Sequence, residues 1–349
     1  MKSREYVFDL LRVIAICAVV LIHTTAIYWY DMEVTDYKWM ILNILDMFAH
    51  YAVPIFFMIS GRFFLDPEKS ISYRKLYLKY ILRLVTAFIF WSAFYTLFNI
   101  YNMILANQNP LSDVKWLIIE FFKGEYHMWF IYVMIGLYII VPLLRKITAD
   151  KKTTEYFLLL FLFFQVFLAN AAYLPKVGVI IRNALDSTVF TMTMGYSGYF
   201  VLGYYLWRFQ FSKKKEFALY FLGVIGIAVT CIGGTVYSIL LQTPNEDFSG
   251  YFNPNMVLGC IAIYLFFIRS KRLSNLNKLK NITLLEKLSG YSFGVYLIHP
   301  VVIWIFLKLN VTSLLNEVIM VPIITVLVTV ISVFFVSIIK SVKLGKYIC

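Results

Sequence analysis

Residues 6–29 read YVFDLLRVIAICAVVLIHTTAIYW, a stretch that is long and apolar enough to cross a bilayer as one helix. Arg12 and His23 are ionisable side chains that interrupt this apolar run. Eleven residues advance a helix by about three turns and about 16 Å, so both side chains project from one face at two depths. Because ionisable groups inside a membrane are costly, Arg12 and His23 are candidate functional residues.

The composition of the whole chain predicts the same environment. With 61% hydrophobic and 15% charged residues over 349 positions, the chain has too few polar residues to cover a water-soluble globule. The four cysteines are scattered and match no disulfide or metal-site spacing, so we expect them to be apolar core residues. The sequence therefore predicts an all-α polytopic membrane protein.

Apolar spans of about 20 residues recur along the chain. They lie near residues 6–29, 38–61, 77–102, 128–144, 155–174, 189–207, 217–241, 254–269, 290–308 and 318–339. No loop between them is long enough to fold separately. We therefore expect about ten transmembrane helices in a single integral domain, residues 1–349. The apolar and polar residues of 111–122 segregate at helical spacing, which predicts a helix lying on the outer membrane surface.

The net charge of +13 is distributed unevenly among the loops. About three quarters of the lysines and arginines fall in alternate loops, together with the two ends of the chain. The positive-inside rule then predicts both termini in the cytoplasm, and we expect a multi-pass protein of the cell (plasma) membrane. Nucleic acid is not an expected partner, because no recognition module accompanies the basic charge.

Further polar residues fall inside the spans and share helix faces. Asn43, Asp46 and His50 occur at i, i+3 and i+7 in the second span. The ninth span carries Ser289, Ser292, Tyr296 and His299 on one face. Each has an alternative structural interpretation, since membrane histidines often bond a neighbouring helix and a membrane arginine can extend to the headgroups.

The first span resembles the signature helix of the membrane-bound acyltransferase 3 family, in FDLLR at residues 8–12 followed by His23. Four further segments resemble the family in the same order. They are PIFFMISG at residues 54–61, HMWF at 127–130, YFVLGY at 199–204 and YSFGVYLIHP at 291–300. We find no segment like the SGNH-type domain that some relatives carry. The resemblance implies a membrane-bound O-acyltransferase that moves an acyl group, usually acetyl from cytosolic acetyl-CoA, to a hydroxyl of a cell-surface glycan or lipid-linked acceptor.

Acyl transfer across a bilayer needs cations for the donor's phosphates and a base beside the acceptor hydroxyl. We expect catalytic roles for His23, as general base or acyl carrier, and for Arg12, with Asp46 or Glu125 orienting the imidazole. The predicted donor contacts are Ser60, Arg62, Arg74, Lys75 and Arg83. The predicted acceptor contacts are His50, His127, Trp129, Tyr296 and His299. We expect no metal and no tightly bound cofactor.

Two other functions remain open on the residues alone. A proton-coupled or amino-acid transporter also places His, Asp and Arg inside the membrane, as a proton relay. A catalytically silent membrane scaffold would tolerate changes at Arg12 and His23.

Overall fold

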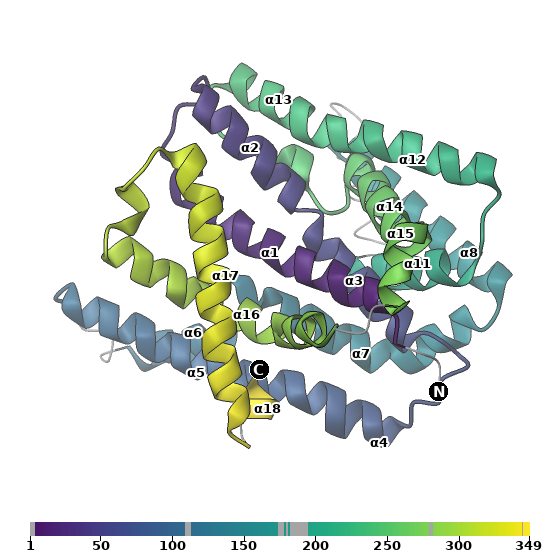
Figure 1. Ribbon diagram of the computed structural model, residues 1–349, viewed down its shortest axis with the longest axis horizontal. Helices are drawn as coiled ribbons and strands as arrows, with labels where there is room; N and C mark the ends of the chain where they lie inside the picture. The colour runs from purple at the N-terminus through teal and green to yellow at the C-terminus, as the bar shows by residue number, and fades with distance from the viewer. Residues whose placement is uncertain are drawn as a thin grey trace. The chain divides into compact units, whose positions relative to one another are not determined.

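The computed structural model describes residues 4–108, 113–173, 178, 181, 195–278, 282–343 and 345–349, and every regular element in these ranges is helical (Figure 1). Within them, eight helices are long and apolar enough to cross a membrane. They are Tyr6–Trp29, Tyr37–Phe64, Tyr73–Leu105, Tyr126–Thr148, Lys151–Ala171, Lys213–Leu241, Thr283–Lys308 and Glu317–Ser341. The all-α membrane class is therefore confirmed.

These eight helices correspond to eight of the ten expected spans. The predicted span at 254–269 is the shorter apolar helix α14, Pro254–Arg269. The predicted span at 189–207 begins outside the described residues, and its described part is α11, Tyr196–Arg208. The last residue of the span expected at 155–174 also lies outside them.

Contacts divide the chain into two compact units, each formed by two separated segments. Unit 1 comprises Met1–Pro67 and Leu144–Val333, and unit 2 comprises Glu68–Leu143 and Phe334–Cys349. Unit 1 contains α1 (Tyr6–Trp29), α2 (Tyr37–Ala49), α3 (Ala52–Phe64), α8 (Lys151–Leu160), α9 (Ala169–Ala171), α11, α12 (Lys213–Ala228), α13 (Gly234–Leu241), α14, α15 (Lys271–Ser274) and α16 (Thr283–Lys308). Unit 2 contains α4 (Tyr73–Lys75), α5 (Leu82–Leu105), α6 (Val114–Lys123) and α18 (Gly345–Ile348). Helices α7 (Trp129–Thr148) and α17 (Glu317–Ser341) contribute residues to both units.

The second predicted span is interrupted between α2 and α3. Pro54 has no N–H, so the carbonyl of His50 cannot receive the usual i+4 helical bond. That carbonyl instead accepts the N–H of Val53 at 3.4 Å. The break places His50 at the joint between two helices, where irregular backbone must be buried in protein or line a polar space.

Helix α1 lies at the centre of unit 1, in contact with α2, α3, α14 and α16 (Figure 1). Helices α3 and α11 approach each other closely at Gly61 and Gly203. A methyl group on Gly61 would overlap the carbonyl oxygen of Phe200, and one on Gly203 would overlap that of Met58. The glycine that ends the PIFFMISG segment is therefore required by backbone contact between two helices.

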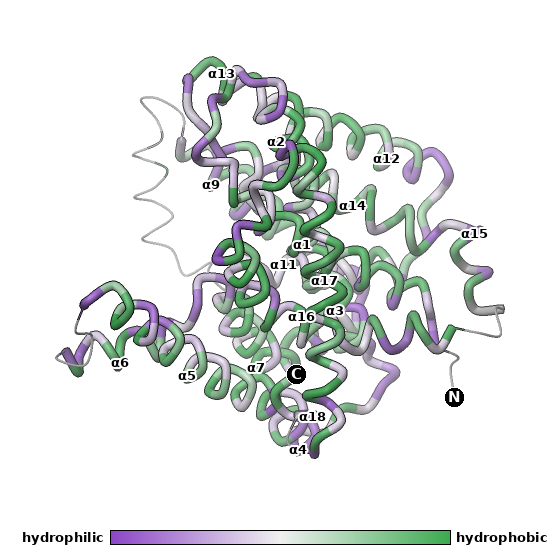
Figure 2. Tube along the Cα trace, turned by 60° about the vertical axis from the view of Figure 1, so that its left-hand side comes forward, coloured by the Kyte–Doolittle hydropathy of each residue, from purple (hydrophilic) through white to green (hydrophobic). Residues whose placement is uncertain are grey.

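The ends of the unit 1 helices meet in two groups that agree with the predicted loop sides. At the Trp29 end of α1, the hydroxyl of Tyr30 donates to Glu246 at 3.1 Å and Lys38 pairs with Glu317 at 3.0 Å. At the opposite end, Arg4 lies 3.7 Å from Glu286. In Figure 2, the middle parts of the long helices are mostly hydrophobic, and hydrophilic residues are more frequent near the helix ends.

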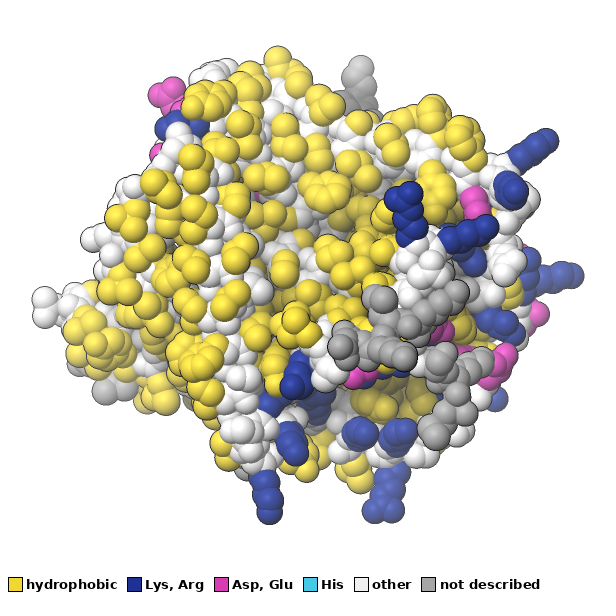
Figure 3. Space-filling model, in the orientation of Figure 1, with side chains coloured by type: hydrophobic (Ala, Val, Ile, Leu, Met, Phe, Trp, Pro, Cys, Tyr) yellow, Lys and Arg dark blue, Asp and Glu magenta, His cyan; other side chains and the backbone are white. Residues whose placement is uncertain are grey.

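The outer face of α12 and α13 is an extended hydrophobic surface, with basic side chains where α12 begins (Figure 3). Phe217, Phe221 and Leu240 contribute to it and are 72%, 58% and 74% exposed. An apolar surface of this extent on a polytopic protein is suited to contact with lipid.

The helix predicted over residues 111–122 is present as α6, although Leu111 and Ser112 lie outside the described residues. Asp113 caps it by accepting the N–H of Trp116 at 3.0 Å. Val114, Ile118 and Phe122 form an exposed apolar stripe at i, i+4 and i+8. This stripe is typical of a helix that lies along a membrane surface, and that position remains a prediction.

Candidate functional site

Arg12 and His23 both face α16. The Arg12 guanidinium donates from Nη1 to Oγ of Ser289 at 2.9 Å, and the His23 ring lies 5.1 Å from the ring of His299. The two contacts are eleven residues apart on α1 and ten residues apart on α16, so the helices run in parallel. The prediction that Arg12 and His23 share one face of α1 is confirmed.

At the Arg12 level, a buried carboxylate joins the two helices. Asp9 accepts a hydrogen bond from Ser289 at 2.6 Å and one from Nε of Arg4 at 2.7 Å, and lies 3.4 Å from Arg12. Two guanidinium groups, those of Arg4 and Arg12, therefore share one buried carboxylate, and a second carboxylate, Glu286, lies 3.7 Å from Arg4. The sequence interpretation missed Asp9, although its i, i+3 spacing from Arg12 within FDLLR was a usable signal.

Arg4 lies outside the spans, and its environment favours the charged form. The hydrogen bond to Asp9 is the main cause that raises the pKa of the Arg4 guanidinium, against a smaller opposing effect of burial. Arg4 and Asp9 therefore form a lasting ion pair where α1 begins.

Arg62, from the end of α3, adds a buried cation to this level. Its side chain is 3% exposed, its Nη2 donates to Glu5 at 2.7 Å, and its guanidinium carbon lies 3.5 Å from the Trp207 ring centroid. Its Nε and Nη1 find no hydrogen-bond partner among the residues that the structure describes. Arg12 and Arg62 flank the Phe63 ring at 5.7 and 5.0 Å. Guanidinium groups are the usual partners of phosphates, and Nε and Nη1 of Arg62 are buried beside the Trp207 ring in this structure.

At the His23 level, His299 is fully buried. Its Nδ1 lies 3.1 Å from the carbonyl oxygen of Val295, and the Tyr296 ring lies 6.4 Å from its own ring. Because a carbonyl oxygen only accepts, Nδ1 must carry a hydrogen, which leaves the lone pair of the neutral ring on Nε2. This level therefore combines two imidazoles, one of which has a defined tautomer.

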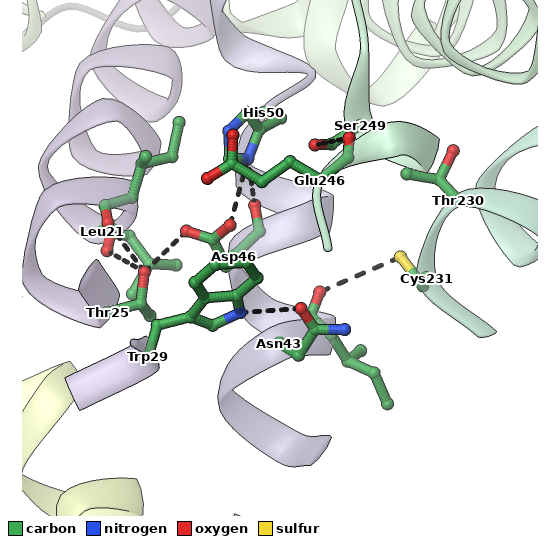
Figure 4. A network of polar contacts seen from close by, with 12 residues as sticks. Leu21, Thr25, Trp29, Asn43, Asp46, His50, Thr230, Cys231, Glu246 and Ser249 are labelled. Carbon is green, nitrogen blue, oxygen red and sulfur yellow. Dashed lines mark hydrogen bonds and ion pairs between the residues drawn. The ribbon is translucent and has the colours of Figure 1, made fainter. Parts of the chain in front are cut away.

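Asp46 lies between α1 and the joint that follows α2 (Figure 4). Its carboxylate accepts a hydrogen bond from Thr25 at 2.7 Å and lies 3.3 Å from Nδ1 of His50. Asp46 was predicted to orient His23, and the structure directs its two oxygens to Thr25 and His50.

Beyond Asp46, a chain of buried polar contacts ties α1 to α13. Trp29 donates to Oδ1 of Asn43 at 2.8 Å, and the amide nitrogen of Asn43 donates to Thr235 at 2.9 Å. Figure 4 shows Trp29, Asn43 and Asp46 on neighbouring turns of α1 and α2. Satisfied networks of this kind fix the rotation of packed helices and thereby the direction of their functional side chains.

The remaining predicted residues are divided between the two units. Ser60, on α3 in unit 1, is partly buried. Unit 2 contains Arg74, Lys75, Arg83, Glu125, His127 and Trp129. Arg74 and Lys75 are exposed on α4, whereas Arg83 donates to the Cys349 carbonyl at 2.5 Å. His127 is 3% exposed and packs edge-on against the Tyr95 ring at 5.4 Å. The structure thus brings together the predicted residues of α1, α2, α3 and α16.

Across the described residues, no group of three or more His, Cys, Asp or Glu side chains is arranged to hold a metal ion. The cysteines are all free, and Cys231, Cys260 and Cys349 are buried as expected of apolar core residues.

Comparison with known proteins adds one match. A family model described as an acyltransferase domain, that of acyltransferase 3, matches residues 5–341, which is nearly the whole chain. No match was found among curated proteins or among solved structures.

Proposed function

Because this chain belongs to the acyltransferase 3 family and is a membrane-bound O-acyltransferase, we propose that it moves an acetyl group from cytosolic acetyl-CoA to a hydroxyl of a cell-surface glycan. The observation that carries this proposal is the pairing of α1 with α16 at two levels. Arg12 with Ser289 forms a cationic level, and His23 with His299 forms an imidazole level about 16 Å away. A reaction that uses a charged donor on one side and an acceptor on the other needs this separation.

The cationic level suits the donor. Coenzyme A carries phosphates, which guanidinium groups bind through paired charge-assisted hydrogen bonds. Arg12 and Arg62 supply such groups, and Nε and Nη1 of Arg62 have no hydrogen-bond partner among the described residues. By the positive-inside rule this end of unit 1 lies in the cytoplasm of a plasma-membrane protein, with both termini on that side. Further donor contacts are assigned to Ser60, Arg74, Lys75 and Arg83, with acetyl-CoA as a substrate rather than a resident cofactor.

The imidazole level suits the chemistry. An imidazole near neutral pH takes the proton of an attacking hydroxyl or accepts the acyl group itself. His23 has this role in our proposal, at a depth between the two membrane faces. On unit 1, the proposed acceptor contacts are His50, Tyr296 and His299, with Asp46 as a carboxylate that orients an imidazole. The roles of His127, Trp129 and Glu125, which belong to unit 2, are proposed from the sequence alone.

The test is transfer of label by the purified protein. Reconstituted vesicles receive radiolabelled acetyl-CoA with or without a cell-envelope glycan fraction, and alkali-labile label on the acceptor is counted. We expect label with the wild-type protein and a loss of at least about 100-fold with His23→Ala. Arg12→Ala is expected to raise the KM for acetyl-CoA. Ile14→Ala is a control from the same helix, because Ile14 is 45% exposed and points away from the packed face.

The same vesicles separate the other two functions. A transporter would move solute or protons with equal dependence on His23 and would label no acceptor. A scaffold would show no acceptor-dependent label and no response to either substitution. Either result in folded protein contradicts the proposal.

A further inference from the structure

The contact between His23 and His299 places a second imidazole beside the proposed catalytic residue. Their rings are 5.1 Å apart and inclined by 30°. One imidazole is enough to take a proton from a hydroxyl in a direct transfer. One imidazole cannot, however, carry the acyl group and also act as the base that activates the attacking hydroxyl.

We propose that the two imidazoles divide these tasks, with His23 as the acyl carrier and His299 as the catalytic base for the acceptor hydroxyl. This inference rests on the proposed function and specifies its mechanism as a two-step transfer through an acyl-enzyme. It also gives His299 a chemical role in place of a binding contact.

The structure prepares His299 for that role. Nδ1 is held by the carbonyl of Val295 at 3.1 Å, so the neutral ring offers its lone pair at Nε2. The side chain is fully buried on α16, the helix that also holds Arg12 through Ser289. To act as the base, Nε2 must come within about 2.6–3.2 Å of the acceptor hydroxyl.

In the first step, a ring nitrogen of neutral His23 attacks the thioester carbonyl, and the carbon–sulfur bond breaks. Coenzyme A leaves as a thiolate and takes the proton from the other ring nitrogen of His23. A neutral acyl-imidazole and a free thiol are the products. No oxidant, reductant or metal is needed.

In the second step, Nε2 of His299 takes the proton of the acceptor hydroxyl as its oxygen attacks the acyl carbon. The carbon–nitrogen bond to His23 breaks, and His299 returns the proton to the imidazole that leaves. The ester and two neutral imidazoles are the products, so both residues are ready for another cycle.

His50 is the other imidazole that this step could use. It is held by Asp46 through Nδ1, an arrangement that also favours a base at Nε2. Its ring neighbour is Tyr251, at 6.1 Å, whereas the ring neighbour of His23 is His299. Direct contact with the acyl carrier therefore favours His299.

The experiment measures the two steps separately in the reconstituted protein. The first step alone exchanges radiolabelled free coenzyme A into unlabelled acetyl-CoA without any acceptor. We expect exchange by the wild-type protein and by His299→Gln and His299→Asn, and none by His23→Gln. Transfer to the glycan fraction should fall by about 100-fold or more in both His299 variants. His299→Asn retains an amide donor toward the Val295 carbonyl, which separates loss of the base from loss of that contact.

Several outcomes would overturn the inference. Transfer by the wild-type protein without exchange would show direct transfer in one step, and would leave the proposed function standing. Transfer by either folded His299 variant within a few-fold of wild type would exclude His299 as the base. Should neither His299 variant fold, absence of exchange in the wild-type protein still refutes the acyl carrier. Absence of both exchange and transfer in folded wild-type protein instead refutes the proposed function.

Discussion

Arg12 of α1 donates to the hydroxyl of Ser289 on α16 at 2.9 Å. A membrane arginine near a helix end can also extend to the lipid headgroups, and here the guanidinium instead bonds a second helix. The Ser289 hydroxyl in turn donates a hydrogen bond to Asp9, on α1, at 2.6 Å. The position of the Arg12 charge is therefore set by packing between α1 and α16.

Loss of the Ser289 hydroxyl should weaken donor binding more than catalysis. Ser289→Ala removes an anchor of Arg12 and leaves the imidazole level intact, so the KM for acetyl-CoA should rise with little change in kcat. A bond to a charged group contributes about 1.5–3 kcal/mol when buried, and Arg12 is 27% exposed, so we expect about a 3- to 10-fold rise. Steady-state transfer kinetics measure both constants. Ser292→Ala is the matched control, because its hydroxyl bonds only the backbone carbonyl of Ser289 among the contacts described. Equal effects of the two substitutions would contradict this account.

A methyl group at Gly61 should prevent α3 from packing against α11. Gly61→Ala and Gly203→Ala each place a carbon against a backbone carbonyl of the facing helix, and backbone cannot move aside as a side chain can. We expect either protein to be lost from the monodisperse peak in size-exclusion chromatography, or to melt at least several degrees lower. Gly290→Ala is the control, since a methyl group there would meet no atom within 4 Å. A folded Gly61→Ala protein with wild-type melting would show that the close approach is not required.

The sequence predicted the helices of the described residues and the shared face of Arg12 and His23, because hydropathy and helical periodicity are local properties. The pairing of Asp46 with His50 follows from their i, i+4 spacing, but the sequence did not predict that His299 lies against His23 or that Asp46 bonds Thr25. Those contacts depend on which helices are neighbours and how each is rotated, and one sequence contains no direct record of either. The break at His50 had a local signal in Pro54, four residues later. The partition of the predicted donor residues between two compact units had no such signal.

Thr25 and Asp46 should be energetically coupled, because the carboxylate accepts the hydroxyl at 2.7 Å in a buried site. We expect Thr25→Val and Asp46→Asn each to destabilise the protein and the double variant to lose less than the sum. The coupling should be on the order of 1–3 kcal/mol, measured by a double-mutant cycle on reversible unfolding in detergent. Thr24→Val with Asp46→Asn is the control cycle, since the Thr24 hydroxyl contacts Thr325 on α17. A Thr25 cycle that is additive within about 0.5 kcal/mol would mean that the two groups do not interact appreciably.

Asp150 should make the stability of α8 depend on pH. This residue lies between two spans and caps the helix by accepting the backbone N–H of Thr153 at 2.7 Å and its hydroxyl at 2.8 Å. These bonds favour the carboxylate and lower the pKa of Asp150 below its ordinary value of 3.8, the backbone bond being the larger cause. A group whose pKa is lower in the folded state stabilises the protein above its unfolded pKa, and that contribution is lost as the pH falls through the folded pKa.

The difference in melting temperature between wild type and Asp150→Asn isolates this contribution. Asparagine keeps an acceptor at the cap and cannot titrate, so the advantage of the wild-type protein should be constant from about pH 5 to 7 and should shrink below about pH 4. Ser212→Ala removes the uncharged cap of α12, where the serine oxygen faces the N–H of Lys215 at 3.4 Å. Its effect should not vary over the same range, which separates the titration of one carboxylate from a general response of the protein to acid. A wild-type advantage at Asp150 that persists unchanged at pH 3 would mean that the cap does not favour the charged carboxylate over its neutral form.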